Sequence, residues 1–113
     1  MKIHALKSCD TCKKAIKALT AAGHSLVVTD VRADGIEAAS LQRWMADVGA
    51  DALVNKRSTT WRGLDDQQRA SAGTPGGATA LILDNPTLLK RPVIETDGAL
   101  YVGWSKEAQA ALL

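Results

Sequence analysis

Residues 2–31 read KIHALKSCDTCKKAIKALTAAGHSLVVTDV, and their pattern of apolar and polar positions predicts a strand, a helix and a second strand. Lys2–Leu6 is the first short apolar run, and it ends at the polar residues 7–10. Apolar residues at helical spacing then make one face of a helix: Cys12, Ala15, Ile16, Leu19 and Ala22. Gly23 is typical of the position just after a helix, and residues 26–31 return to a strand. The stretch therefore predicts a parallel βαβ unit with a right-handed crossover.

The segment from about 36 to 90 is predicted to be mainly helical. Its first helix has an apolar stripe and is expected to end at Gly49; the stripe is Leu41, Trp44, Met45 and Val48, with Trp44 in the core. Residues 51–73 are polar and helical only in patches. Thr74 and Pro75 suit the N-cap and first position of a further helix, which Asn85-Pro86 ends. Its expected buried face is Ala78, Leu81 and Ile82.

The C-terminal part predicts a hairpin followed by a short helix. Val93–Thr96 and Ala99–Val102 flank Asp97-Gly98, a dipeptide that tolerates the two positive φ angles of a type I′ turn. Residues 104–113 form an Ala-rich helix, with Trp104 packing at its start. The order β-α-β, helices, β-β-α is the thioredoxin topology. We therefore expect an α/β fold with a four-stranded mixed sheet, as a single domain over residues 1–113 with a helical insertion at about 36–90.

Composition and charge support a small globular protein. The chain has 113 residues, of which 46% are hydrophobic, enough for one packed domain. Its net charge of +2 is uneven, because residues 1–32 hold six basic and two acidic residues. A basic N-terminal third suits a small anion or a thiolate better than a nucleic acid duplex. The N-terminal apolar run is too short for a signal peptide or a membrane span, so we expect a cytoplasmic protein.

The two cysteines, Cys9 and Cys12, carry the predicted chemistry. Cys9 falls at or near the N-cap of the first helix, where unpaired backbone N–H groups and the helix dipole favour a thiolate. Cys12 lies one turn further along, within reach of a disulfide or sulfenic acid on Cys9. Three other interpretations stay open: a zinc site, two inert core cysteines, or a purely structural Cys12 on the apolar stripe. The zinc site is disfavoured because only His4 and His24 remain as further imidazole ligands.

Two cationic stretches are candidates for anion binding. Arg91 precedes Pro92 at the start of the third predicted strand, which in this topology faces the helix that carries the cysteines. A cis-proline is a recurrent feature at that place, and the guanidinium suits an oxyanion or a carboxylate. Residues 55–62, which include Arg57, form a dense polar run that is either an anion-binding wall or a solvated loop.

These residues resemble the arsenate reductase (ArsC) family over nearly the whole chain. The resemblance rests on Cys9-Asp10-Thr11, on residues 52–62 (ALVNKRSTTWR) and on residues 89–94 (LKRPVI). It is closest to the family's small glutathione-dependent reductase-like members, and the Spx-type regulators are relatives. The resemblance implies a thioredoxin-like fold and a thiol oxidoreductase, with no bound cofactor and no metal, and with glutathione or a similar thiol as co-substrate.

Site residues follow from matching the motifs position by position. Cys9 matches the family nucleophile, Thr11 an anion-cradling loop residue, and Arg91 the arginine before the cis-proline. Two further arginines of the arsenate reductases are replaced here by Asn55 and Gly103, with Arg57 a displaced substitute for the first. Arsenate is therefore a doubtful substrate. Cys12 departs from the pattern of the single-cysteine reductases, which have Ser there, and its expected role as a resolving thiol comes from its spacing to Cys9.

The implied partners are small or transient. We expect a small-molecule thiol or oxyanion, with a glutaredoxin-type reductant as a further option. We expect no direct contact with nucleic acid or a membrane, and a monomer. The alternative from another functional class is an Spx-like redox-sensing regulator that binds RNA polymerase through a Cys9–Cys12 switch. Spx-type regulators run longer at the C-terminus, and residues 55–62 look more like the reductase-like members.

Overall fold

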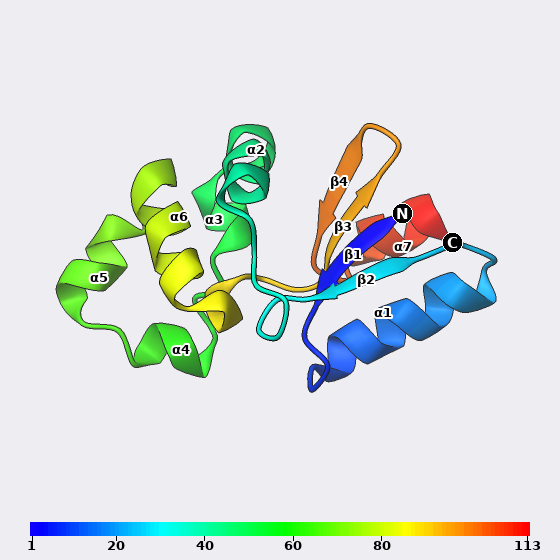
Figure 1. Ribbon diagram of the computed structural model, residues 1–113, viewed down its shortest axis with the longest axis horizontal. Coiled ribbons are helices and arrows are strands. Elements are labelled where there is room, and N and C mark those ends of the chain that lie inside the picture. The colour runs from blue at the N-terminus through cyan, green and yellow to red at the C-terminus, as the bar shows by residue number, and fades with distance from the viewer. The chain divides into compact units, whose positions relative to one another are not determined.

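The computed structural model describes residues 1–113, which divide into two compact units. The first unit comprises Met1–Asp34 and Arg91–Leu113, and the second comprises Gly35–Lys90. Figure 1 shows the elements, which in chain order are β1 (Lys2–Ala5), α1 (Asp10–Ala21), β2 (Val27–Asp30), α2 (Ala38–Val48), α3 (Ala50–Leu53), α4 (Thr59–Arg62), α5 (Asp66–Ser71), α6 (Pro75–Asp84), the 3₁₀ helix η1 (Pro86–Leu88), β3 (Val93–Thr96), β4 (Ala99–Val102) and α7 (Lys106–Leu112). The second unit covers nearly the same residues as the expected insertion.

The first unit is built on a four-stranded mixed sheet in the order β2-β1-β3-β4. β1 pairs with β2 in parallel and with β3 in antiparallel, and β3 pairs with β4 in antiparallel. The expected mixed sheet is thus confirmed. β2 is an edge strand, which explains why Val27 and Val28 remain 62% and 50% exposed.

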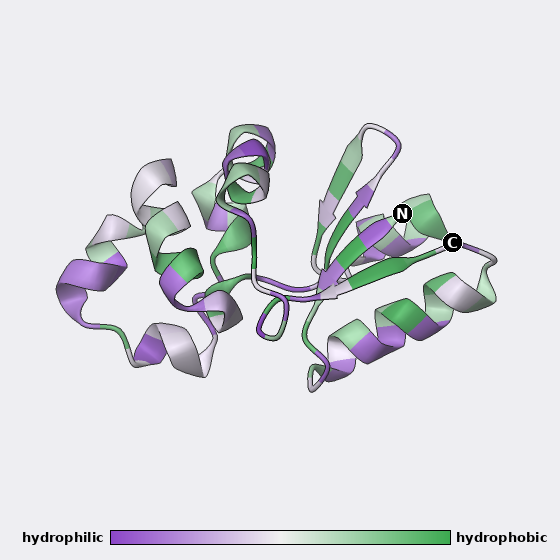
Figure 2. Ribbon diagram, viewed as in Figure 1, coloured by the Kyte–Doolittle hydropathy of each residue, from purple (hydrophilic) through white to green (hydrophobic).

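Helices α1 and α7 cover the same face of this sheet. Ile3 and Ile94 lie opposite each other across β1 and β3, so their side chains point to one face. Both are fully buried with Ala15 and Leu19 of α1, and Leu112 of α7 packs against this cluster. Figure 2 shows apolar and polar residues alternating along α1, the pattern of a helix with one buried side. The predicted βαβ unit therefore forms by burying Cys12, Ala15 and Leu19 of the predicted stripe, whereas Ile16 is half-buried and Ala22 is exposed just after the end of α1.

The hairpin β3–β4 confirms both predicted strands but not the predicted turn. Gly98 has a φ of +75°, whereas no residue other than glycine has a positive φ. A type I′ turn needs positive φ at both central residues, so this turn is of another type. The last helix also begins two residues later than expected, at Lys106, because the Ser105 hydroxyl caps it by accepting a hydrogen bond from the Ala108 N–H. Trp104 precedes that cap and packs against the core of the sheet.

The second unit is helical, as its sequence predicts. Helix α2 buries Leu41, Trp44 and Met45 and ends at Gly49, whose φ is +85°. Helix α6 begins at Pro75 after Thr74, whose hydroxyl accepts a hydrogen bond from the Gly77 N–H. The expected buried face of α6, Ala78, Leu81 and Ile82, is confirmed. Three short helices, α3, α4 and α5, occupy the polar stretch between α2 and α6.

The helices of this chain are short. None of them combines the length and the hydropathy needed to cross a membrane.

Candidate functional site

The turn that joins β1 to α1 places Cys9 at the start of the helix. The Cys9 N–H donates to the Leu6 carbonyl at 2.9 Å, which closes a four-residue turn. Cys9 has extended backbone angles (φ −84°, ψ 117°), and its carbonyl accepts the first helical hydrogen bond from the Lys13 N–H at 3.0 Å. Cys9 is therefore the N-cap residue of α1, as expected. Its thiol makes no capping hydrogen bond and remains half-buried rather than enclosed.

The environment of Cys9 favours the thiolate. Burial is the largest single effect and raises the pKa of Cys9. The Cys12 backbone N–H, the Cys12 thiol and the Arg91 guanidinium act in the other direction, and together they outweigh burial. The pKa of Cys9 is consequently lower than that of an ordinary cysteine. A thiolate at a helix N-terminus beside a cation is the usual form of a nucleophilic cysteine.

Cys12 has the opposite character. It is 1% exposed on the apolar face of α1, and its pKa is raised to about 11, mainly by burial. The neighbouring Cys9 thiol contributes to this rise, because two negative charges one turn apart repel each other. The two thiols are both free, and Cys9 is the more acidic of the two.

Arg91 and Pro92 complete the site. They begin the second of the two chain segments that make up the first unit. Pro92 is fully buried, and the Arg91–Pro92 peptide bond is cis. Arg91 is half-buried, and its positive charge lowers the pKa of Cys9. The Gly103 N–H donates to the Pro92 carbonyl at 2.8 Å, so β3 and the residue after β4 are joined beside the proline. The structure therefore brings Arg91 together with Cys9 and Cys12, although they are far apart in the sequence.

The remaining predicted site residues lie elsewhere. Thr11 is exposed in the first turn of α1, two residues after Cys9. Arg57 is exposed and belongs to the second unit, whereas Cys9 belongs to the first. There, the Arg57 N–H donates to Asn55 Oδ1 at 3.1 Å, and the Arg57 carbonyl accepts from Arg62 Nη2 at 3.0 Å. The polar run is thus an ordered turn leading into α4, with its side-chain cations exposed.

Asp30 lies next to the Cys9 turn and is not among the site residues predicted from the sequence. It ends β2, is only 7% exposed, and its carboxylate accepts hydrogen bonds from three backbone N–H groups. One of these donors is Lys7, in the turn that carries Cys9. An Asp at a strand end that is followed by Asp34-Gly35 is a signal for a side-chain-capped turn, and that signal was available in the sequence.

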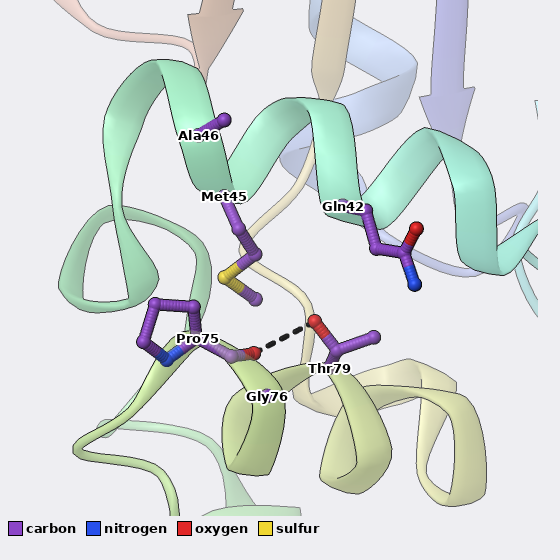
Figure 3. A pocket seen from close by; sticks show the side chains of 6 residues that line it. All are labelled: Gln42, Met45, Ala46, Pro75, Gly76 and Thr79. Carbon is purple, nitrogen blue, oxygen red and sulfur yellow. Dashed lines mark hydrogen bonds between the residues drawn. The ribbon is translucent and has the colours of Figure 1, made fainter.

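Hollows on the two units differ in chemistry. In the first unit, a hollow of about 400 Å³ and another of about 330 Å³ both reach Leu6, Lys7 and Asp30, beside the Cys9 turn. In the second unit, a pocket of about 430 Å³ lies between α2 and α6 (Figure 3). Figure 3 shows Met45 pointing toward α6, where Thr79 donates to the Pro75 carbonyl at 2.8 Å. No titratable or nucleophilic side chain lines that pocket, so the hollows beside the Cys9 turn are the better candidates for chemistry.

No group of three or more His, Cys, Asp or Glu side chains is arranged to hold a metal ion. The two cysteines thus have no third metal-ligating side chain from these residue types beside them.

Comparisons with known proteins agree with this fold. The model of the ArsC family matches residues 4–112. An uncharacterized protein of Haemophilus influenzae (strain ATCC 51907 / DSM 11121 / KW20 / Rd) is 43% identical over 110 residues, which are 96% of each chain. The structure of the YffB (PA3664) protein has a TM-score of 0.91 at 37% identity, covering 99% of this chain and 97% of that one. An arsenate reductase (ArsC) related protein from Brucella melitensis has a TM-score of 0.75 at 34% identity, covering 97% and 91%. The resemblance read from the motifs is therefore confirmed at the level of the family, and this chain, thioredoxin-like in fold, belongs to the ArsC family.

Proposed function

We propose that this protein is a thiol-dependent reductase that uses glutathione or a similar small thiol, with Cys9 as its nucleophile. The observation that carries the proposal is the lowered pKa of the Cys9 thiol at the N-cap of α1, beside Arg91. A structural cysteine has no need of such surroundings, whereas a nucleophile gains thiolate at neutral pH from them. Family membership and the printed description of the Brucella relative as related to arsenate reductase support the same class of chemistry.

The proposed reaction is thiol–disulfide exchange on a mixed disulfide, R–S–S–G, where G–S is glutathione. The Cys9 thiolate attacks the glutathione sulfur, which forms a Cys9–glutathione disulfide and breaks the substrate S–S bond. The substrate leaves as a thiolate and takes a proton from water. A second glutathione thiolate then attacks the glutathione sulfur on Cys9, which releases the Cys9 thiolate and forms oxidised glutathione. The substrate disulfide is reduced at the expense of one glutathione.

Cys12 offers a second route for the last step. Its thiolate can attack the Cys9–glutathione disulfide, forming a Cys9–Cys12 disulfide and releasing reduced glutathione. The raised pKa of Cys12, about 11, keeps it mostly protonated while Cys9 carries its negative charge. Forming the Cys9–glutathione disulfide removes that charge and one cause of the raised pKa, although burial, the larger cause, remains. We therefore propose that glutathione resolves the intermediate faster than Cys12 does.

Arg91 and Arg57 are the proposed cations for the carboxylates of glutathione. Arg91 is the better supported, because its charge already acts on Cys9. Lys7 and Lys13 line the hollow beside the Cys9 turn and add positive charge there. Thr11 is proposed to contribute its hydroxyl from the first turn of α1. The contribution of Arg57 is proposed from the family motif alone.

Turnover of a mixed disulfide between glutathione and a small thiol tests the proposal. We expect Cys9→Ser to abolish glutathione-driven reduction and Cys12→Ser to keep most of it. Full activity of Cys9→Ser would overturn the proposed nucleophile. No turnover in the wild-type protein, together with binding to RNA polymerase that is lost on oxidation, would instead support the regulatory alternative.

The variant Arg91→Ala is expected to change both the binding of glutathione and the ionisation of Cys9, so the two effects must be measured separately. Losing the guanidinium weakens glutathione binding by about 1–3 kcal/mol if one charge-assisted contact is lost. It also removes a charge that lowers the pKa of Cys9, so reactivity at neutral pH falls for a second reason. Iodoacetamide alkylation followed over a pH series gives the ionisation of Cys9 in each protein, and its plateau rate, reached when Cys9 is fully ionised, compares the thiolates without the effect of ionisation. We expect equal plateau rates and a raised KM for glutathione.

A further inference from the structure

The Asp30 carboxylate binds three backbone N–H groups on two separate segments. Oδ1 accepts from Arg32 at 2.9 Å and from Ala33 at 2.8 Å, which shapes the turn after β2. Oδ2 accepts from the Lys7 N–H at 3.0 Å, 23 residues away in the sequence. Both oxygens of one buried carboxylate are therefore engaged, and one of them holds the segment that leads to Cys9.

The Lys7 N–H lies inside the turn that positions Cys9. Leu6 and Cys9 close this turn through their backbone hydrogen bond, so Lys7 is its second residue. The Lys7 N–H points away from that bond and has Asp30 as its partner. Asp30 in turn is fixed at the end of β2, where Val31 N–H donates to the Ala5 carbonyl at 2.8 Å. Asp30 thus adds a hydrogen-bonded link from the end of β2 to the turn that leads from β1 to Cys9.

We propose that Asp30 is a positioning residue for Cys9: by holding the Lys7 N–H, its carboxylate keeps the Leu6–Cys9 turn where the Cys9 thiol meets the first turn of α1 and Arg91. The inference rests on the proposed role of Cys9 as nucleophile. Asp30 itself does not act on the Cys9 sulfur directly. It acts on the Cys9 turn through the backbone of Lys7.

The direction of the electrostatic effect separates this role from a simple charge effect. A negative charge near Cys9 disfavours the thiolate, so Asp30 acting only as a charge would raise the pKa of Cys9. Asp30 acting by position lowers the pKa of Cys9, because it keeps the sulfur close to the Cys12 N–H and the Arg91 guanidinium. Hydrogen bonds from Ala33, Lys7 and Arg32, with a contribution from the Lys7 ammonium, lower the pKa of Asp30. Asp30 is therefore ionised throughout the range in which Cys9 titrates.

The experiment measures the pKa of Cys9 from the pH dependence of iodoacetamide alkylation in four full-length proteins, with Cys12→Ser as the common background. The variants are Asp30→Asn, which removes the charge and leaves one acceptor oxygen for N–H groups that lie on both sides of the carboxylate, and Asp30→Glu, which keeps the charge and changes the reach. Asp34→Ala is the matched control. Its carboxylate accepts from the Asp30 N–H at 2.9 Å, so this variant removes a nearby charge without touching the Lys7 bond. Thermal unfolding is recorded for each protein.

The three roles give different outcomes. Positioning predicts that Asp30→Asn and Asp30→Glu both raise the pKa of Cys9, which slows alkylation at pH 6.5 about three- to tenfold, while Asp34→Ala does not. A pure charge effect lowers the pKa of Cys9 in Asp30→Asn and Asp34→Ala alike. A merely structural role lowers the unfolding temperature and leaves the pKa of Cys9 unchanged. Either of the last two results overturns the proposal. Because alkylation needs neither glutathione nor turnover, failure of the proposed reductase activity would be seen separately.

A second pair of variants tests the same bond from the Lys7 side, in case the Asp30 variants do not fold. Lys7→Pro removes the N–H donor, and proline is common at the second position of type I and type II turns. Lys7→Ala removes the same ammonium but keeps the N–H. We expect Lys7→Pro to raise the pKa of Cys9 relative to Lys7→Ala. Equal values in the two variants would overturn the proposal.

Discussion

Cys9 and Cys12 differ at the scale of the single residue although they are separated by one helical turn. Cys9 caps α1 and has a lowered pKa, whereas Cys12 is buried with a pKa of about 11. At neutral pH Cys12 is therefore almost entirely protonated. We predict that iodoacetamide at pH 6–7 modifies Cys9 first, as peptide mapping after partial reaction would reveal. Faster labelling of Cys12 would mean that the first helix begins elsewhere.

The same spacing permits a disulfide between the two thiols. Residues three apart at a helix N-terminus allow the short bridge geometry, and both thiols are free in the structure. We predict that mild peroxide gives a monomer that has lost two hydrogens, measured by intact mass. Cys12→Ser is the control and should accumulate sulfenic acid or a mixed disulfide on Cys9. A Cys9-linked dimer of the wild-type protein would count against Cys12 as the resolving thiol.

At the scale of elements, α5 and α6 approach each other too closely for a side chain at Gly77. A Cβ on Gly77 would lie 1.9 Å from the Ser71 carbonyl oxygen, a backbone atom at the end of α5. The neighbouring Gly76 has nothing within 4 Å of its Cβ position. We predict that Gly77→Ala lowers the free energy of unfolding by about 1–3 kcal/mol through overpacking.

Gly76→Ala is the matched control on the same helix. It should be neutral or stabilise by up to about 1 kcal/mol, because alanine favours the helix over glycine. Urea unfolding of the two variants measures the difference. Equal free energies of unfolding in the two variants would show that α5 and α6 can move apart at Gly77 without loss of stability.

The hairpin and the helix caps illustrate which element boundaries are readable in advance. Thr74 was identified as an N-cap because Thr before Pro is a strong local signal, and its hydroxyl does cap α6. Ser105 caps α7 equally well, but it follows an aromatic residue, and the sequence pattern therefore predicts a helix that begins two residues too early. The Asp97-Gly98 turn kept the predicted strands but not the predicted backbone angles, because several turn types accept glycine at the second central position.

At the scale of the whole molecule, the resemblance implies fewer cations for an oxyanion than the arsenate reductases have. Asn55 and Gly103 stand at the positions that the resemblance assigns to two arginines, which leaves Arg91 at its matching position and Arg57 as a displaced candidate. We predict that arsenate is turned over well below about 1 s⁻¹, since arsenate carries about two negative charges near neutral pH and lacks its matching cations.

Adding back an arginine that the arsenate reductases have tests the argument from charge more directly. Asn55→Arg should raise arsenate turnover without raising glutathione-driven disulfide reduction. Gly103→Arg is a poorer variant, because Gly103 has a φ of +84° and any side chain there is strained. Wild-type arsenate turnover above that rate, measured with glutathione as the reductant, would contradict the argument from charge.

The amino-acid sequence was enough to predict the βαβ unit, the four-stranded mixed sheet and Cys9 at the start of α1. These features follow from periodicity, capping and turn chemistry, which act between residues close together in the chain. The turn capped by Asp30 is a local signal, but the bond from the Lys7 N–H to Asp30 could not be predicted in this way, because it joins residues 23 positions apart. The character of Cys12 also depended on packing: the helical stripe placed it inward, but the rise of its pKa to about 11 comes from burial and from the neighbouring Cys9 thiolate. Local sequence pattern thus accounts for where Cys9 lies, while the contacts that set its ionisation and hold its turn exist only once the sheet has brought distant segments together.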